Sequence, residues 1–346
     1  MRRFIIVVLA MALLAAGALG EDEPRKAEVL ELPEAADGEF AILTREQDPM
    51  IGPHEEGYLF EDGDKSPTGY ADPSITVNVG TGTIYDTWYM YARVKIADPS
   101  QIRVMTSNPS LSSSSSVMGH LLAKRVKAVV AVNGVLEADV SGGSSYCFVD
   151  GPVLHQGVWK RPSANVSEKR LSNWKAREGL DTLVIDDGGD LRILEASTWG
   201  ETYEQILAMG DAAVNVINFG PALVVDGEAR YGYENNGQMA THRPAQRMAI
   251  CQTGPLEYLL ITSEGPEDRN RKGLTLDQFV ELLDTEFPEI QTAYNLDGGS
   301  SSTLLFRKGS EFWAKINCPK GGKKRPLRDL IYFADAWMPD GEDEGT

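Results

Sequence analysis

The chain has 346 residues, of which 42% are hydrophobic and 24% are charged. These proportions are ordinary for a globular protein with a sizeable core, and they exclude disorder as the main state. The 51 acidic residues outnumber the 33 basic ones, which gives a formal net charge of −18. Because so negative a surface repels phosphate backbones, we expect no nucleic-acid partner, and an anionic substrate requires a locally basic pocket.

The first twenty residues are typical of an export signal. Arg2 and Arg3 precede an apolar run over residues 4–16, and small residues at Ala18 and Gly20 lie just before an acidic stretch. This order predicts a signal peptide over residues 1–20. Its apolar run of about thirteen residues is short for a membrane anchor. We therefore expect a secreted or cell-envelope protein with no stable membrane span once the signal is removed.

The rest of the chain divides by composition. Residues 21–70 form an acidic leader rich in Pro and Gly, and residues 339–346 form an acidic tail. Between them, residues 71–338 carry short apolar runs separated by tight turns, which predicts one folded domain. We find no internal repeat, and the serine run at 112–116 is the one low-complexity stretch.

The predicted elements favour an α+β fold with a β-rich core of mostly antiparallel strands and a few packed helices. Asp-Gly pairs between apolar runs are strong hairpin signals, and they occur at 150–151, 187–188 and 226–227. Patterning then predicts, in chain order, strands at 74–79 and 87–96, a helix at 117–125, a strand at 128–132, helices at 202–209 and 276–286, and a strand at 290–296. The helix at 276–286 is the clearest, because Thr275 and Gln278 form a capping box and Pro288 follows its end.

The sharpest local motif follows the strand at 290–296. Asp297 is followed by Gly298 and Gly299 and then by four hydroxyl residues, Ser300, Ser301, Ser302 and Thr303. Glycines let the backbone turn steeply and approach a ligand, and amides with hydroxyls bind anions. A carboxylate beside such a cradle suits attack on a sugar or activation of a water. The alternative is a plain Asp-Gly hairpin.

Three weaker motifs accompany it. Arg247 opens an apolar run four residues after Arg243, and its guanidinium either binds phosphate or forms a structural ion pair. Asn133 directly follows the strand at 128–132 and either contacts a ligand or shapes a turn. Asn218 and Gly220 open a segment that is either a ligand contact or a hairpin with a bulge.

In series, these four motifs resemble the phosphodiester glycosidase family. The matching features are Asn133-Gly134, Gly-Pro-Ala-Leu-Val-Val-Asp-Gly at 220–227, Arg247 before Met-Ala-Ile, and Leu-Asp-Gly-Gly-Ser-Ser-Ser at 296–302. The resemblance spans roughly residues 95–337 and includes a closing strand at 325–333. It implies hydrolysis of sugar 1-phosphodiesters, such as those of N-acetylglucosamine, at the anomeric carbon, with a glycan or glycolipid phosphodiester as the substrate.

The resemblance also implies roles for individual residues. The implied catalytic residues are Asp297, Arg247 and Asn133. The implied substrate-binding residues are Gly298, Gly299, Ser300, Ser301, Ser302, Thr303, Asn218, Gly220 and Arg243. The chain departs from the family pattern at Val135-Leu136-Glu137, where relatives carry aromatic residues, and at Met248 and Cys251. These departures favour the alternative, a non-catalytic carbohydrate-binding or envelope-assembly protein on the same fold.

Several features of the chemistry stay open at this level. Glu137 and Asp139 are the candidate second carboxylates, and cleavage of the P–O bond on the other side of the phosphate is a third function. We expect no required cofactor, with Ca²⁺ or Mg²⁺ bound through Asp297 as the alternative. The chain has three cysteines, Cys147, Cys251 and Cys318. Either two of them form a disulfide and the third is a free thiol, or all three are buried thiols. The sequence identifies neither the sugar nor the oligomeric state.

Overall fold

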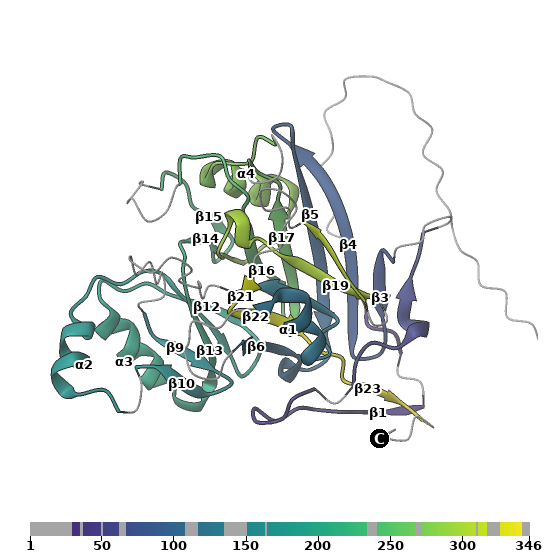
Figure 1. Cartoon of the computed structure of the whole chain (residues 1–346), viewed down its shortest axis with the longest axis horizontal. Helices are drawn as coiled ribbons and strands as arrows, with labels where there is room; N and C mark the ends of the chain where they lie inside the picture. Colours follow the sequence, from purple (N-terminus) through teal and green to yellow (C-terminus); the bar gives the residue numbers. More distant parts are fainter. Residues whose placement is uncertain are drawn as a thin grey trace, which may run out of the picture.

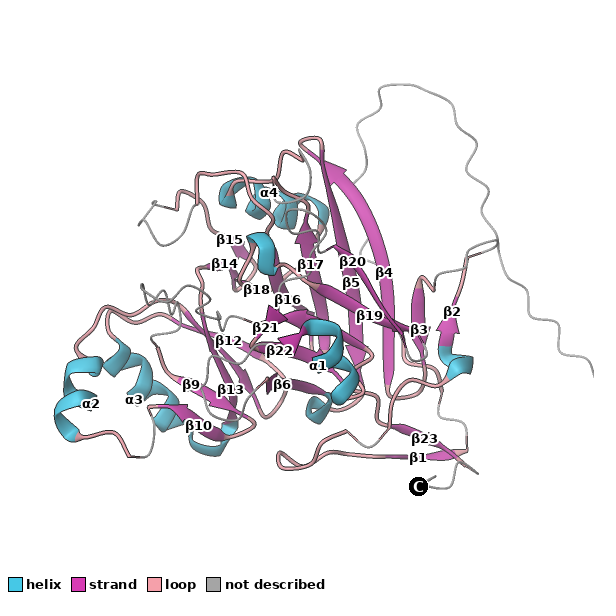
Figure 2. Cartoon of the chain, viewed as in Figure 1, coloured by secondary structure: helices cyan, strands magenta, loops and turns pink. Residues whose placement is uncertain are grey.

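The structure, a computed structural model, describes residues 30–34, 37–49, 51–61, 67–107, 117–134, 151–162, 165–233, 241–266, 271–308, 311–316 and 326–340. The predicted signal peptide, the serine run, Cys147, Cys318, Glu137 and Asp139 lie outside these residues. Within them, antiparallel strands dominate and a few helices cover the sheets, which confirms the predicted α+β class (Figure 2).

A large antiparallel sheet carries most of the core. Its strands lie in the order β15 (Glu228–Ala229), β14 (Ala222–Val225), β18 (Thr292–Asn295), β16 (Met248–Gly254), β17 (Glu257–Ser263), β5 (Thr87–Ile96), β4 (Ile75–Ile84), β3 (Gly69–Ala71) and β2 (Tyr58–Leu59). The two longest strands, β4 and β5, form the tall hairpin of Figure 1. The predicted strands at 74–79 and 87–96 are thereby confirmed.

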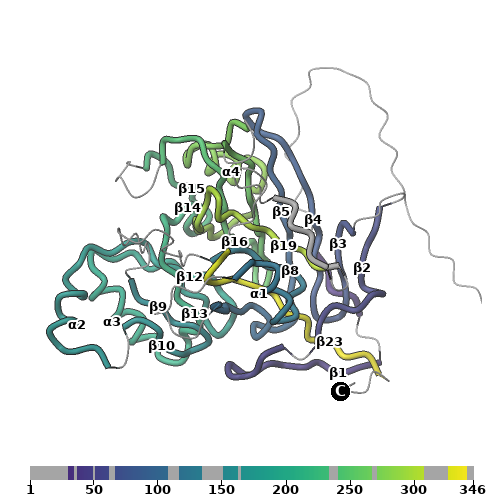
Figure 3. Tube along the Cα trace, viewed as in Figure 1, coloured from purple at the N-terminus to yellow at the C-terminus, as the bar shows by residue number. Residues whose placement is uncertain are grey.

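Two smaller antiparallel sheets pack beside it. The β8 sheet has the order β20 (Glu311–Ile316), β19 (Leu304–Lys308), β8 (Val130–Asn133), β22 (Asp329–Phe333) and β6 (Ile102–Thr106). The β11 sheet has the order β10 (Val158–Arg161), β9 (Val153–His155), β13 (Ala213–Asn218), β11 (Thr182–Asp186) and β12 (Leu191–Leu194). Two short ribbons pair β1 (Gly38–Phe40) with β23 (Trp337–Pro339) and β7 (Val117–Met118) with β21 (Pro326–Leu327). The first ribbon places segments from the two ends of the chain side by side (Figure 3).

Successive side chains of a strand point to opposite faces, so the two faces of the large sheet bury different sets of residues. One face contributes side chains such as Val94 and Leu260 to a cluster shared with Val130 and Ile331 of the β8 sheet. The opposite face packs against Phe279 and the other apolar residues of α4 (Leu276–Glu286). The β8 sheet is covered in turn by α1 (Gly119–Arg125), and the β11 sheet by α3 (Trp199–Met209), with α2 (Glu168–Lys175) beside α3. Short 3-10 turns complete the elements: η1 (Glu55–Gly57), η2 (Pro99–Gln101), η3 (Gly210–Ala212) and η4 (Gly299–Ser301).

Local sequence signals predict several of these elements well. The side chain of Thr275 accepts from the amide of Gln278, so the capping box of α4 is confirmed. The Asp226–Gly227 turn joins β14 to β15 with φ angles of 51° and 78°. The predicted helix at 117–125 begins two residues later, at Gly119, because Val117 and Met118 pair with β21 as β7. The helix α2 was not expected, and none of its residues is buried.

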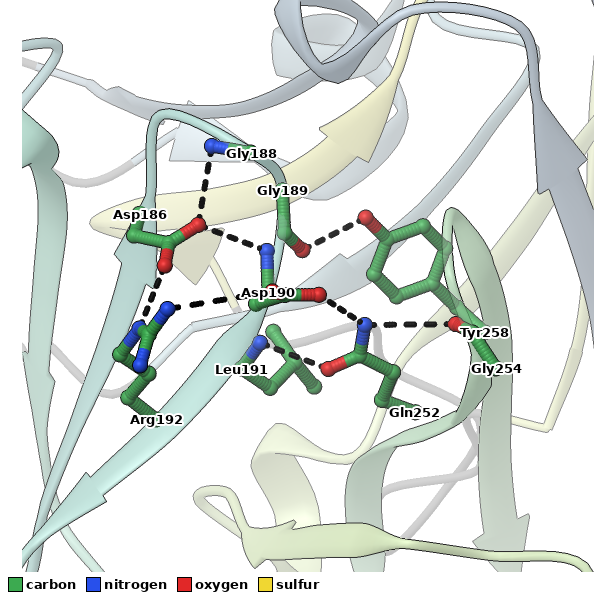
Figure 4. A network of polar contacts seen from close by, with 9 residues as sticks. All are labelled: Asp186, Gly188, Gly189, Asp190, Leu191, Arg192, Gln252, Gly254 and Tyr258. Carbon is green, nitrogen blue, oxygen red and sulfur yellow. Dashed lines mark hydrogen bonds and ion pairs between the residues drawn. The ribbon is translucent and has the colours of Figure 1, made fainter.

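A polar network fixes the β11 sheet to the large sheet (Figure 4). The tip of the β11–β12 hairpin is held by Asp186, whose Oδ1 accepts from the amides of Gly188 and Asp190 at 2.9 Å each. Across the junction, Gln252 of β16 donates to Asp190 Oδ1 at 2.8 Å and accepts from the amide of Leu191 at 2.8 Å. Tyr258 of β17 donates to the carbonyl oxygen of Gly189 at 2.7 Å, and burial raises the pKa of this hydroxyl.

Candidate active site

The register of the large sheet places Asp297 across from Arg247. Ala249 of β16 lies opposite Asn295 of β18, and beyond them the amide of Leu296 donates to the carbonyl oxygen of Met248 at 2.9 Å. The amide of Gly299 then donates to the carbonyl oxygen of Gln246 at 2.9 Å. If this register continues one pair further, the backbone of Asp297 falls opposite that of Arg247 just past the end of the ladder, in line with Ala249 and Asn295.

The glycines after Asp297 are required by close backbone approach. A Cβ atom at Gly298 would lie 2.6 Å from the carbonyl oxygen of Gln246, so no side chain fits there without movement of the backbone. Gly299 has a φ of 55°, the left-handed region that favours glycine, and starts η4. We call residues 297–303 the Asp297 loop. Its conformation depends on glycine at both positions.

Asn133 holds both ends of the Asp297 loop. Its amide Nδ2 donates to the carbonyl oxygen of Asp297 at 2.8 Å, and its Oδ1 accepts from the amide of Thr303 at 2.8 Å. Nδ2 also donates to the carbonyl oxygen of Gly134 at 3.0 Å, and the side chain is buried. Because these bonds use both amide protons, Asn133 is placed as a positioning residue that ties the β8 sheet to the loop.

The hydroxyls of the loop do not share one environment. Ser300 is partly exposed, whereas Ser301, Ser302 and Thr303 are buried. The hydroxyl of Thr303 donates to the carbonyl oxygen of Ser301 at 2.9 Å and stabilises the loop from within. The Ser302 hydroxyl is buried and has no hydrogen-bond partner. The structure thus offers Ser300 as the accessible hydroxyl of the row.

Arg247 is buried and is engaged by the backbone around it. Its Nε donates to the carbonyl oxygen of Leu274 at 3.0 Å, and its Nη2 donates to the carbonyl oxygen of Arg243 at 2.8 Å. Nη2 also lies 3.4 Å from the carbonyl oxygen of Thr241. The guanidinium therefore fixes the backbone of residues 241–243. It also fixes the backbone of Leu274, which lies two residues before α4. The side chain of Arg243 is exposed, and it is the backbone of this residue that meets Arg247.

Asn218 and Gly220 lie beside the strand that leads to Asp297. The carbonyl oxygen of Gly220 accepts from Asn295 Nδ2 at 2.8 Å, and Gly220 has a φ of 70°. The buried Asn218 accepts from the hydroxyl of Thr182 at 2.7 Å and donates to the carbonyl oxygen of Pro152. Both polar ends of the Asn218 side chain are therefore used within the β11 sheet and its neighbours.

Sequence reasoning missed two polar residues at this site. Asn295 is 5% exposed, precedes Asp297 by one strand period, and has an Oδ1 with no hydrogen-bond partner. Asp329 is 4% exposed, and a Cβ atom at Gly134 would lie 2.4 Å from its Oδ2. The carboxylate of Asp329 thus packs directly on the turn that follows Asn133. Alternation back from Asp297 could have found Asn295, and an acid inside the apolar run at 327–333 could have drawn attention to Asp329.

Metal-binding clusters, long apolar helices and free thiols were the remaining features of interest in the described residues. Among the described residues, no group of three or more His, Cys, Asp and Glu side chains is arranged to hold a metal ion. The same residues contain no helix that is long and apolar enough to cross a membrane. Cys251 is a free buried thiol, and burial raises its pKa.

Two solved structures resemble the chain in fold. The zebrafish N-acetylglucosamine-1-phosphodiester alpha-N-acetylglucosaminidase catalytic domain, in a structure described as auto-inhibited by its pro-peptide, is similar in fold, with 17% identity and a TM-score of 0.56. The match covers 90% of this chain and 100% of that one. A hypothetical protein from Synechocystis matches with 15% identity and a TM-score of 0.46 over 78% of this chain and 64% of that one.

The comparison with curated proteins gives no match. The family model described as phosphodiester glycosidase matches residues 126–334, which is more than half of the chain. This stretch contains Asn133, Arg247 and the Asp297 loop. The protein therefore belongs to the phosphodiester glycosidase family.

Proposed function

We propose that the protein hydrolyses the glycosidic bond of sugar 1-phosphodiesters and releases the sugar and a phosphomonoester. The proposal is supported by the backbone register, which brings Asp297 opposite Arg247 just past the β16–β18 ladder. A carboxylate beside a cation, on a loop with close backbone approach, meets both demands of the reaction. The sugar side develops positive charge and the leaving phosphate carries negative charge.

The chemistry assigns a role to each group. The bond between the anomeric carbon and the phosphate oxygen breaks, and the electron pair leaves with the phosphomonoester. Asp297 acts on the sugar side, as base toward water, as nucleophile or as the anionic partner of the oxocarbenium-like transition state. Because phosphate is a weak base, its departure requires no strong acid. Amides of the Asp297 loop, the hydroxyl of Ser300 and the positive charge of Arg247 stabilise it.

Arg247 and Asn133 support this chemistry mainly through position. Nε and Nη2 of Arg247 donate to backbone carbonyl oxygens. The positive charge that stabilises the leaving phosphate is therefore held in a fixed, buried position. Asn133 sets the carbonyl oxygen of Asp297 and the amide of Thr303 at fixed distances. We further propose that Asp329, packed on Gly134, is the second carboxylate near the site.

Hydrolysis in ¹⁸O-labelled water tests the proposed bond cleavage. A panel of α-linked sugar 1-phosphodiesters, including N-acetylglucosamine and glucose derivatives with alkyl or aryl aglycones, supplies the substrates. Cleavage at the anomeric carbon places the label in the sugar. Label in the phosphate would instead assign a phosphodiesterase that leaves sugar 1-phosphate.

A non-catalytic carbohydrate-binding role is the second candidate. The observation that favours it is that the side chains of Asn133, Asn218 and Thr303 bond to the protein itself. A binding protein would retain sugar phosphodiesters in equilibrium dialysis and leave every member of the panel intact. Turnover of any member that is lost in Asp297→Asn excludes this role.

Metal dependence and export complete the proposal. We propose that the carboxylate and guanidinium suffice, so activity persists after treatment with a chelator. Loss of activity that Ca²⁺ or Mg²⁺ restores would instead assign Asp297 as a cation ligand. We also propose export directed by residues 1–20, which expression of the full chain in a bacterial host, with fractionation and N-terminal sequencing of the product, tests.

A further inference from the structure

A buried pair of carboxylates joins the N-terminal part of the chain to its C-terminal part. Asp72 follows β3 and Asp335 follows β22, and the two residues are 7% and 1% exposed. The hydroxyl oxygen of Tyr70 lies 2.7 Å from Asp72 Oδ2 and 2.8 Å from Asp335 Oδ2. The hydroxyl oxygen of Ser74 lies 2.8 Å from Asp72 Oδ1 and 3.1 Å from Asp335 Oδ1.

The protons of the two hydroxyls are too few for these four contacts. Each hydroxyl carries one proton and so donates once. The hydroxyl oxygens of Tyr70 and Ser74 already accept from the amides of His54 and Ala336, at 3.0 Å each. With both carboxylates ionised, two of the four contacts would bring oxygen lone pairs together in a buried place, which is strongly unfavourable. One additional proton on a carboxyl group resolves one of these two contacts. The contact that then remains without a proton is the longest of the four, at 3.1 Å between Ser74 and Asp335.

The donors around each carboxylate show which one holds the proton. Asp72 Oδ1 accepts from the amides of Ser74 at 2.6 Å and Ile75 at 2.9 Å, in addition to the Ser74 hydroxyl. These donors stabilise an ionised Asp72. Asp335 accepts from the amide of Trp337 at 2.9 Å and is more deeply buried. The proton therefore belongs on Asp335 Oδ2, which donates to the hydroxyl oxygen of Tyr70 while Tyr70 donates to Asp72.

The groups that act on Asp335 agree with this assignment. Burial, and then the negative charge of Asp72, raise the pKa of Asp335 to about 7. Burial and the same two carboxylates also raise the pKa of Tyr70, so its hydroxyl keeps its proton. On the C-terminal side, the ring Nε2 of His54 lies 2.8 Å from the carbonyl oxygen of Trp337.

The network holds chain segments that are far apart in the sequence. Tyr70 and His54 belong to the segment that contains η1, β2 and β3, and Asp335 leads into β23, which pairs with β1. We propose that a single proton on Asp335 fastens the N-terminal segment to the C-terminal segment, and that this latch loosens as the pH rises above neutrality. The proposal is independent of the chemistry at Asp297.

The sign of the effect follows from proton uptake. A folded chain that keeps the Asp335 proton up to about pH 7 binds one more proton than the unfolded chain between that pH and the ordinary range of an aspartate. The contribution of this proton to stability is therefore complete below the ordinary range of an aspartate, declines above that range, and is gone once the pH has risen through about 7.

The variant Asp335→Asn lacks the titrating group at this position and keeps all others. The difference between wild type and variant therefore reports the Asp335 proton alone. Its amide can donate to Tyr70 at all pH values and its oxygen can accept from Trp337, so it imitates the protonated state. Thermal unfolding of the full chain is measured from pH 5 to pH 8.5 for wild type and variant. We expect the wild-type midpoint to fall relative to Asp335→Asn by about 3 °C or more across this range. Parallel curves would overturn the proposal.

A matched control and a spectroscopic readout complete the test. Asp226→Asn changes an exposed aspartate in an Asp-Gly turn that asparagine also suits, and its curve should stay parallel to wild type. Infrared spectra of the wild type at pH 6 should contain a protonated carboxyl band that Tyr70→Phe shifts to higher frequency, because the acceptor of the proton is removed. This readout does not require Asp335→Asn to fold, and a wild type without such a band at pH 6 contradicts the latch.

Discussion

Asn133 ends β8 and Asp297 follows β18, a strand of another sheet, yet the amide Nδ2 of Asn133 donates to the carbonyl oxygen of Asp297 at 2.8 Å. The same side chain accepts from the amide of Thr303, so one residue spans the whole Asp297 loop. The loop is thereby held against Arg247 on one side and β8 on the other. This clamp fixes the backbone that carries the Asp297 carboxylate, and the proposed reaction at an anomeric carbon depends on such positioning.

Asn133→Ala should therefore weaken both structure and turnover. Removing the side chain leaves a buried carbonyl oxygen and a buried amide without partners, at a cost of about 1–3 kcal/mol for each group. We expect a loss of about 2–6 kcal/mol in the free energy of unfolding, measured by urea denaturation. Turnover should fall while KM changes less, since the loop is misplaced and the remaining contacts persist. Unchanged stability would show that the clamp is not required.

Gly298→Ala should disable the loop while leaving the sheet intact. The new methyl group would meet the carbonyl oxygen of Gln246 at 2.6 Å, so the loop has to move away from Arg247. We expect turnover to drop by about tenfold or more, as for a misplaced catalytic group. Gly254→Ala, at the end of β16, is the matched control, because its Cβ would meet only the Glu257 side chain, at 3.5 Å. Equal activity of the two variants would contradict the required close approach.

Arg247→Lys tests whether geometry or charge alone matters at this position. A lysine keeps the positive charge but cannot bind the carbonyl oxygens of Leu274 and Arg243 together. We expect kcat/KM of Arg247→Lys to fall nearly as far as that of Arg247→Ala, with thermal stability lowered in both. If Arg247→Lys kept most of the wild-type kcat/KM, charge without fixed position would be sufficient.

Tyr258→Phe should affect the junction between sheets and spare the chemistry. The hydroxyl of Tyr258 donates to the carbonyl oxygen of Gly189, far along the chain from the Asp297 loop (Figure 4). Its removal should lower the free energy of unfolding by about 1 kcal/mol, with turnover per folded molecule unchanged. Denaturant unfolding and steady-state kinetics on the same preparation give both values. A large loss of turnover would show that the junction is coupled to the site.

How much could be predicted from sequence depended on whether the signal was local. The capping box at Thr275 and the Asp-Gly turn at 226–227 act through neighbouring residues, and α4 and the β14–β15 hairpin appear where they were predicted. Val117 and Met118 read as the start of a helix, but pairing with β21, some two hundred residues later, makes them a strand. The helix α2 was not predicted, because none of its residues is buried and its sequence therefore lacks an apolar stripe.

The candidate site shows the same division. The Asp297 loop was recognisable because its glycines and hydroxyls are consecutive. The partners of Asn133 and Arg247 were not, because those contacts join residues distant in the chain or use backbone atoms that carry no sequence signal. Arg247 was expected either to bind phosphate or to form an ion pair, and its bonds to the carbonyl oxygens of Leu274 and Arg243 had no sequence signal. Asp329 was missed because its neighbours predict an ordinary buried strand.

The central claim is that the carboxylate of Asp297 carries the reaction, and turnover by Asp297→Asn tests it most directly. The wild type and the variant are compared on one sugar 1-phosphodiester that the wild type cleaves, after both are shown to unfold at similar temperatures. Because asparagine keeps the shape and loses the charge, the account predicts a fall in kcat of about a hundredfold or more. A folded variant with near-normal kcat would contradict it.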